Sequence, residues 1–168
     1  MTRGRGWRFL DFGRRIERSL SVIHLLHAAA SVKTRPVAVL EPVLEIADSV
    51  MTYRRRYFAG AQLPAVLELL LMDEGNPRAL AFQLKALTEH AAQLPRESHA
   101  LSGFDEKQRL AALWARLRGA DLTALTQARE AGMSAALDSL LSDVVTELGL
   151  VSNQLAHHYF SHTVARAS

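Results

Sequence analysis

Apolar residues recur every three or four positions along most of the chain, which is the spacing of one face of an α-helix. Alternating runs rich in valine, isoleucine and threonine, which are typical of strands, are missing from the sequence. The pattern therefore predicts an all-α fold, a helical bundle of five to seven helices with no sheet. The first stripe consists of Phe9, Phe12, Ile16, Leu20, Ile23 and His27.

Prolines, glycines and short acidic turns divide this pattern into separate helices. Asn76 and Pro77 fit the N-cap and the first position of one helix, and Asp105 fits the N-cap of the next. Residues 63–72 are apolar almost all round, so we expect this helix to be deeply buried, and Gly149 marks a candidate bend in the last helix. The predicted helices cover approximately residues 6–31, 36–60 or 42–60, 63–72, 77–93, 105–119, 121–130 and 132–166.

The length and composition limit the classes of protein to which the chain can belong. A chain of 168 residues is of the size of one domain, so we treat residues 1–168 as a single unit. Cysteine is absent, which excludes disulfides, thiolate metal sites and a cysteine nucleophile, and which fits a cytoplasmic protein. The longest apolar run, residues 63–72, contains Glu68 and is too short to cross a bilayer, so we do not expect a membrane partner.

Charge is distributed unevenly along the chain. Residues 1–60 carry eleven Lys/Arg and five Asp/Glu, whereas residues 61–168 carry nine and twelve, so the two parts have net charges of +6 and −3. A basic first third could bind a nucleic acid, but the chain has no helix-turn-helix signature. We therefore do not favour a nucleic-acid partner.

The sequence YRRRY, at residues 53–57, raises the question of where its three arginines point. If the apolar stripe of the second predicted helix is continued through this segment, Arg54 falls on the apolar side and Arg56 points to solvent. A buried guanidinium needs an anionic partner, and we expect Glu17 of the first helix to supply it. This pair would either fix the register of two helices or frame a ligand pocket.

Arg78 follows Pro77 in what we predict to be the first turn of a helix, where the helix dipole favours anions. Either Asp73 or Asp48 pairs with it, or the arginine and the helix terminus bind a carboxylate or phosphate. The full set of candidate ligand-binding residues is Arg14, Glu17, Arg18, Arg54, Asp73, Asn76 and Arg78.

Motifs for metal binding and catalysis are missing from the sequence. His24 and His27, and likewise His158 and His162, could each share a helix face, but no Glu-x-x-His motif accompanies them. No Gly-x-Ser-x-Gly elbow or glycine-rich phosphate loop is found either. We therefore expect no metal centre, no cofactor and no catalytic residue.

Several short motifs occur in an order that resembles the alpha-E family, a bacterial all-helical family. They are GWRFL at residues 6–10, GRRIER at 13–18, MTYRRRY at 51–57, NPR and AFQL within 76–84, and YFSH at 159–162. The chain resembles the C-terminal half of that family, whose members are about twice as long. The resemblance therefore implies a helical face that the other half would cover, or a homodimer that replaces it.

Members of the alpha-E family accompany a circularly permuted ATP-grasp ligase and a transglutaminase-like protein. The resemblance therefore implies a non-catalytic interaction or accessory module in a peptide-ligation or peptide-modification system, with one of those proteins as its partner. The alternative is a domain that binds an anion, or acts as an enzyme on one, through its arginine and glutamate cluster. In that case the ligand would be the carboxylate or phosphate of a peptide-like substrate.

Overall fold

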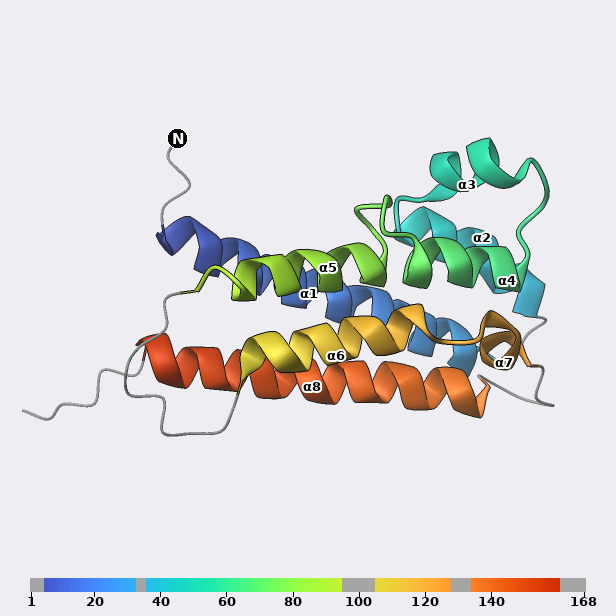
Figure 1. Cartoon of the computed structure of the whole chain (residues 1–168). Helices are drawn as coiled ribbons and strands as arrows, with labels where there is room; N and C mark the ends of the chain where they lie inside the picture. The colour runs from blue at the N-terminus through green and yellow to red at the C-terminus, as the bar shows by residue number, and fades with distance from the viewer. Residues whose placement is uncertain (1–4, 33–35, 95–104, 128–133, 161–168) are drawn as a thin grey trace, which may run out of the picture.

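The structure is a computed structural model that describes residues 5–32, 36–94, 105–127 and 134–160. Within these ranges the chain forms α-helices and one π-helical segment, with no strand, which confirms the all-α prediction (Figure 1). The elements are α1 (Arg5–Ser31), α2 (Pro36–Ile46), α3 (Val50–Tyr57), α4 (Leu63–Leu67), η1 (Glu68–Met72), α5 (Leu80–Ala91), α6 (Glu106–Arg118), α7 (Leu122–Thr126) and α8 (Ala135–Phe160).

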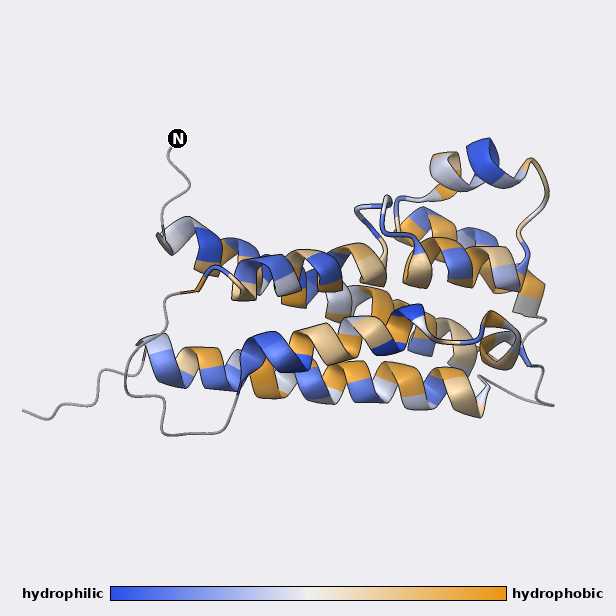
Figure 2. Ribbon diagram, viewed as in Figure 1, coloured by the Kyte–Doolittle hydropathy of each residue, from blue (hydrophilic) through white to orange (hydrophobic). Residues whose placement is uncertain are grey.

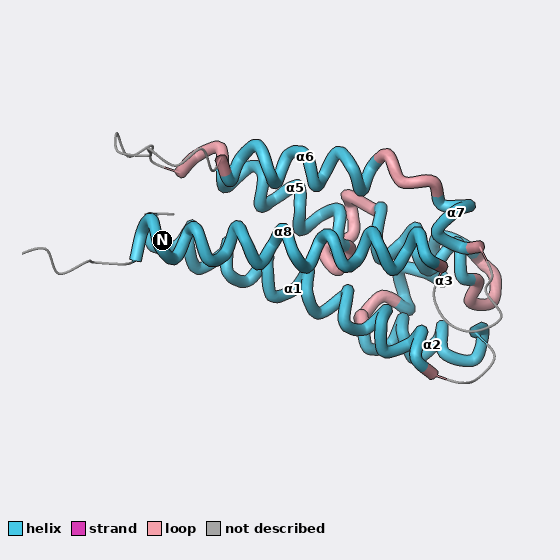
Figure 3. Tube along the Cα trace, turned by 90° about the horizontal axis from the view of Figure 1, so that it is seen from below, coloured by secondary structure: helices cyan, strands magenta, loops and turns pink. Residues whose placement is uncertain are grey.

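Four helices, α1, α5, α6 and α8, pack side by side around a common core, each contacting two of the others (Figures 1 and 3). Apolar residues recur along every one of these helices, as the hydropathy colouring of Figure 2 shows. Leu84, Leu110, Leu141 and Leu148 are completely buried where the helices meet. Complete burial of a leucine side chain contributes about 1.5–3 kcal/mol, so this leucine-rich core holds the four long helices together.

The second predicted helix is divided into α2 and α3 by a turn at residues 47–49. Asp48 has a left-handed backbone with φ of 50°. The Ser49 N–H donates to the Leu44 carbonyl and the Asp48 N–H to the Glu45 carbonyl. These are the two hydrogen bonds of a Schellman motif, which ends a helix, and aspartate tolerates the left-handed position better than most residues. The turn therefore gives α3 a direction and a helical phase of its own.

Residues 63–72 are mostly buried or half-buried, as their composition predicts, with Pro64 and Glu68 exposed. They form α4 followed directly by the π-helical segment η1, in which the Asp73 N–H donates to the Glu68 carbonyl at 3.1 Å. Leu69, Leu70 and Leu71 are consecutive, and all three are completely buried. This segment packs against α5 and α6 and closes one end of the core.

The predicted N-cap role of Asn76 is wrong, because α5 begins at Leu80 with Ala79 as its N-cap. The buried side chain of Asn76 instead donates from Nδ2 to the Leu69 carbonyl at 3.1 Å. Its Oδ1 accepts from the Arg78 N–H at 3.0 Å. Asn76 thus ties the turn to η1, and Arg78 lies in this turn and not in the first turn of a helix.

The remaining boundaries follow the sequence more closely. Asp105 caps α6 by accepting from the Gln108 N–H at 3.0 Å, as predicted. Helix α8 continues through Gly149 without interruption. Residues 95–103, between the predicted helices 77–93 and 105–119, and the expected end of the last helix, residues 161–166, lie outside the described residues. No helix in the described part of the chain is long and apolar enough to span a bilayer.

Candidate functional site

The arginines proposed as ligand-binding residues do not gather at one place. Arg14 and Glu17 are exposed on α1, and Arg54 lines one cavity on α2 and α3. Arg18 and Arg78 line a second cavity between α1, the end of α2 and the turn before α5. The structure therefore brings together only Arg18 and Arg78 from the predicted set of arginines.

The predicted burial of Arg54 and its pairing with Glu17 are both wrong. Both side chains are exposed, and in the described part of the chain Arg54 forms no ion pair. Because the Schellman turn at Asp48 resets the phase of α3, the buried position passes to Tyr53. The Tyr53 hydroxyl donates to the Gly60 carbonyl at 3.2 Å and accepts from the Gln62 N–H at 3.0 Å.

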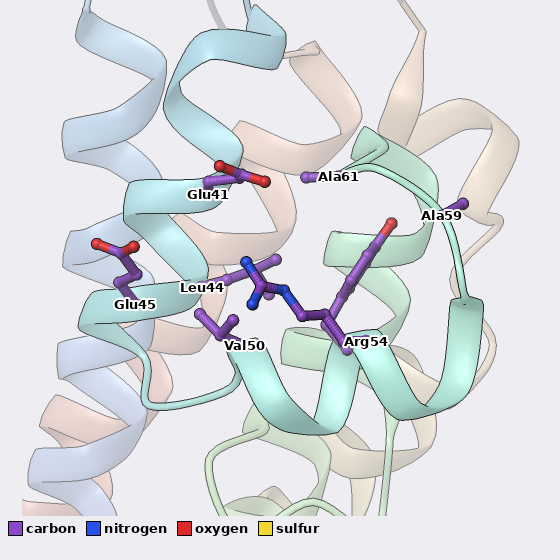
Figure 4. A pocket seen from close by; sticks show the side chains of 8 residues that line it. Glu41, Leu44, Glu45, Val50, Arg54, Ala59 and Ala61 are labelled. Atoms are coloured by element: carbon purple, nitrogen blue, oxygen red, sulfur yellow. The ribbon is translucent and has the colours of Figure 1, made fainter.

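Arg54 extends back across the first cavity toward α2, whose Glu41 and Glu45 also line this cavity (Figure 4). This cavity has a volume of about 30 Å³. Such a space holds approximately one water molecule and cannot hold a peptide-like substrate. The Arg54 cavity is therefore a local feature of the α2–α3 junction.

Asp73 and Asn76 of the predicted set have structural roles in the segment before α5. The Asp73 carboxylate accepts from Arg56 at 2.7 Å and from the Gly75 N–H at 2.8 Å. The pair with Arg56 connects α3 to the end of η1, so Arg56 is not simply solvated as its position in the sequence suggests. Neither Asp73 nor Asn76 lines either of the two cavities.

The second cavity is an open groove with a volume of about 300 Å³. The more buried lining residues, Val22, Leu25 and Ala47, give it an apolar floor. Arg78 is held at the rim by an ion pair with Asp48, which is one of the two carboxylates predicted for it. Arg18 forms no ion pair or hydrogen bond with any described residue. The complete lining is Arg18, Ser21, Val22, Leu25, Ile46, Ala47, Asp48, Pro77 and Arg78.

A polar network between α1 and α5 was missed by the sequence analysis. The buried Asp11 carboxylate contacts His90 Nε2 at 2.7 Å and Arg15 Nε at 3.2 Å. Arg15 also donates to Gln83 Oε1 at 3.2 Å, and Gln83 Nε2 donates to the Pro77 carbonyl at 2.5 Å. One signal in the sequence could have revealed the network, namely an aspartate next to Phe12 in the first apolar stripe.

The environment of Asp11 shifts its pKa. Burial of the carboxyl acts to raise the pKa, but the hydrogen bonds from His90 and Arg15 and the positive charge of Arg15 outweigh burial and lower it. The carboxylate is therefore ionised in the folded protein at neutral pH. The network fastens the start of α1 to α5, and the Trp7 ring packs edge-on against His90 with centroids 5.8 Å apart.

One of the histidines considered as metal ligands has a carboxylate partner on another helix. His158 Nδ1 lies 3.0 Å from Glu106 Oε1 and joins α8 to α6. His162 lies outside the described residues. In the part of the chain that the structure describes, no three His, Asp or Glu side chains are grouped so that they could hold a metal ion.

Comparison with known proteins supports the resemblance seen in the motifs. The model of a family described as a predicted alpha-helical domain with a conserved ER motif matches residues 1–160. The chain contains one Glu-Arg dipeptide, at Glu17 and Arg18.

Curated relatives are uncharacterized proteins of Mycobacterium bovis and of two strains of Mycobacterium tuberculosis. Each is 34% identical to this chain over 154 residues, which cover 89% of the chain and 17% of the relative. The chain thus spans about a sixth of the length of these relatives. No solved structure matches it.

Proposed function

The chain belongs to the Alpha-E family, and on this premise we propose that it is a non-catalytic helical interaction module. Its proposed partner is an ATP-grasp-type ligase or a transglutaminase-like protein of a peptide-ligation or peptide-modification system. The observation that carries the proposal is an exposed apolar and basic face on α3, which we call the α3 face. It consists of Met51, Arg55 and Phe58.

The α3 face exposes large apolar side chains to solvent. Met51 is 69% exposed and Phe58 is 88% exposed. Arg55 is exposed between them and forms no ion pair with a described residue. Phenylalanine, methionine and arginine are enriched at protein–protein interfaces, so this composition fits a partner with an apolar and acidic surface.

The backbone at Phe58 supports the same interpretation. Phe58 follows the last residue of α3 and has a left-handed backbone with φ of 48°. This conformation is unfavourable for an aromatic residue, and in the isolated chain the exposed ring gains little from packing that would offset the strain. A phenylalanine held in this way serves a binding surface better than it serves stability.

The test is a binding measurement between the purified chain and the ATP-grasp-type ligase from the same genome, followed by the transglutaminase-like protein. We expect a complex with one of them, seen by size-exclusion chromatography and titration calorimetry. The Phe58→Asp variant should weaken this complex at least about tenfold, because it removes an apolar anchor. Aspartate tolerates the left-handed backbone, so this variant keeps the fold.

The matched control is Leu150→Asp, which makes the same kind of change at an exposed leucine of α8. The control should bind as tightly as the unchanged chain. Absence of a complex with either protein would reject the proposed partners. Equal binding by Phe58→Asp would reject the α3 face as the docking surface.

A further inference from the structure

The groove between α1 and the end of α2 is a second candidate binding surface, separate from the α3 face. We propose that it binds an acidic, aliphatic segment of a partner polypeptide, with Arg18 pairing with a carboxylate of that segment. Three features carry this proposal: the shape of the groove, its charge and the position of Arg18 in the family motif.

The groove has the size and the lining of a ligand site. Its volume of about 300 Å³ is at the lower end of the range for ligand pockets, roughly 300–1,000 Å³. Val22 and Leu25 form its floor, and Ile46 adds a large apolar side chain that is 73% exposed at the rim. Aliphatic side chains of an occupant would cover this surface and remove it from water.

The charge of the groove favours an acidic occupant. Arg78 is already neutralised by Asp48, so its charge is balanced within the protein. Arg18 has no such partner among the described residues, although it lines the same groove as the apolar floor residues. A guanidinium group can donate two parallel hydrogen bonds to a carboxylate, and this geometry is strongest where apolar groups exclude water.

Packing within the domain does not explain the presence of Arg18. The residue is exposed, and it belongs to the Glu17–Arg18 dipeptide, the one place in the chain that fits the ER motif in the family description. A family motif at an exposed position that forms no bond with the described residues points to binding and not to stability.

The rim of the groove is open, which selects a polypeptide segment over a small enclosed ligand. Arg18, Ser21, Ile46 and Pro77 are all exposed along the rim. The Schellman turn at Asp48 holds the end of α2 in place, so the groove exists before an occupant arrives. An extended segment can lie along such a groove and place alternate side chains on its floor.

The experiment measures binding of two amidated peptides to the purified full chain. One has the sequence Gly-Leu-Glu-Leu-Leu with an uncharged dye at its N-terminus, and the other has glutamine in place of glutamate. We expect fluorescence polarisation to show at least about tenfold tighter binding of the glutamate peptide. Arg18→Gln should remove this difference, and added salt should reduce it.

Two matched controls separate the groove from general charge and apolar effects. Arg14→Gln removes the same charge from an exposed position of α1 outside the groove, and should leave the preference for glutamate intact. Ile46→Asp should abolish binding, whereas Val37→Asp, at an exposed position of the same helix outside the groove, should not. All four sites are exposed, so the variants should unfold at the same temperature as the unchanged chain.

Several outcomes would overturn the proposal. The first is that the chain binds neither peptide, and the second is that Arg14→Gln and Arg18→Gln weaken binding of the glutamate peptide equally. The third is that octanoate binds as tightly as the peptide, which would indicate a small carboxylate as the occupant. A homodimer that dissociates in Ile46→Asp would assign the groove to a second copy of the chain. Phe58→Asp should leave peptide binding unchanged, so this test and the test of the α3 face can fail independently.

Discussion

At the scale of single residues, the buried carboxylate of Asp11 should contribute to the stability of the fold. Asp11→Asn removes the charge that pairs with Arg15, and it leaves the Arg15 guanidinium group and the His90 ring without a carboxylate partner. We expect the variant to lose about 2 kcal/mol of unfolding free energy at pH 7, the size of a hydrogen bond to a charged group. Urea unfolding followed by circular dichroism measures the loss.

The pH dependence of this effect follows from the direction of the pKa shift. The pKa of Asp11 is lower in the folded than in the unfolded chain, where it is about 3.9. The stabilisation is therefore complete above pH 4 and is lost as the pH falls through the folded value. The difference between the unchanged chain and Asp11→Asn should shrink below pH 4. Asp138→Asn, at an exposed aspartate, should change stability by less than about 0.5 kcal/mol.

At the scale of elements, the end of α3 is where stability and binding are opposed. Phe58→Gly relieves the left-handed backbone at no loss of packing, because the ring is exposed. The gain is partly offset by the entropy of glycine in the unfolded chain, so we expect about 0.5 kcal/mol of added stability. Thermal unfolding measures this change, and a loss of stability would show that the Phe58 ring packs on the protein after all.

The control for Phe58→Gly is Met51→Gly, which places glycine inside α3 at another exposed apolar position. It should lower the unfolding free energy by about 1 kcal/mol, because glycine is unfavourable in a helix. Both variants remove an apolar side chain from the α3 face. If the two variants change stability in opposite directions but weaken partner binding to a similar degree, the contribution of α3 to stability is separate from its contribution to binding.

A second prediction at the scale of elements concerns the stability of helix α8. Gly149 lies within the helix, and a Cβ atom added there would meet nothing within 4 Å. Gly149→Ala should therefore raise the unfolding free energy by about 0.5–1 kcal/mol, measured by urea unfolding. The reverse change at an exposed alanine of the same helix, Ala156→Gly, should lower it by a similar amount. A destabilised Gly149→Ala would mean that the helix needs flexibility at this point.

At the scale of the whole molecule, the helices differ in how firmly they are held. Helices α1, α5, α6 and α8 surround the leucine core, whereas α3 packs mainly on α2 and stands apart from the four (Figure 1). Native-state hydrogen exchange should therefore show the fastest amide exchange in α3 and the slowest in α5 and α8. Protection of α3 equal to that of α5 would contradict this order and would indicate that α3 is covered in solution.

The fold was largely predictable because helices are specified by residues that lie close together in the sequence. The three-to-four spacing of apolar residues identified the helices. The capping residue Asp105 marked the start of α6 correctly, and the largely apolar composition of residues 63–72 predicted their burial. Asn76 was assigned the wrong role because its side chain bonds to Leu69, and a contact to a preceding helix is not visible in a capping pattern. A polar residue near the end of a helix can either cap that helix or bond to another backbone group, and the sequence pattern is the same in both cases.

What the sequence by itself determined is the all-helical class and the apolar face of each long helix, because both depend on the spacing of residues a few positions apart. Only the tertiary structure decided where the charged residues lie. One left-handed residue, Asp48, turned Tyr53 inward and Arg54 outward. Asp11 became buried because a partner 79 residues away, His90, lies beside it in the folded chain. The cost of burying a charge depends on such partners, and they are brought together only by the packing of helices.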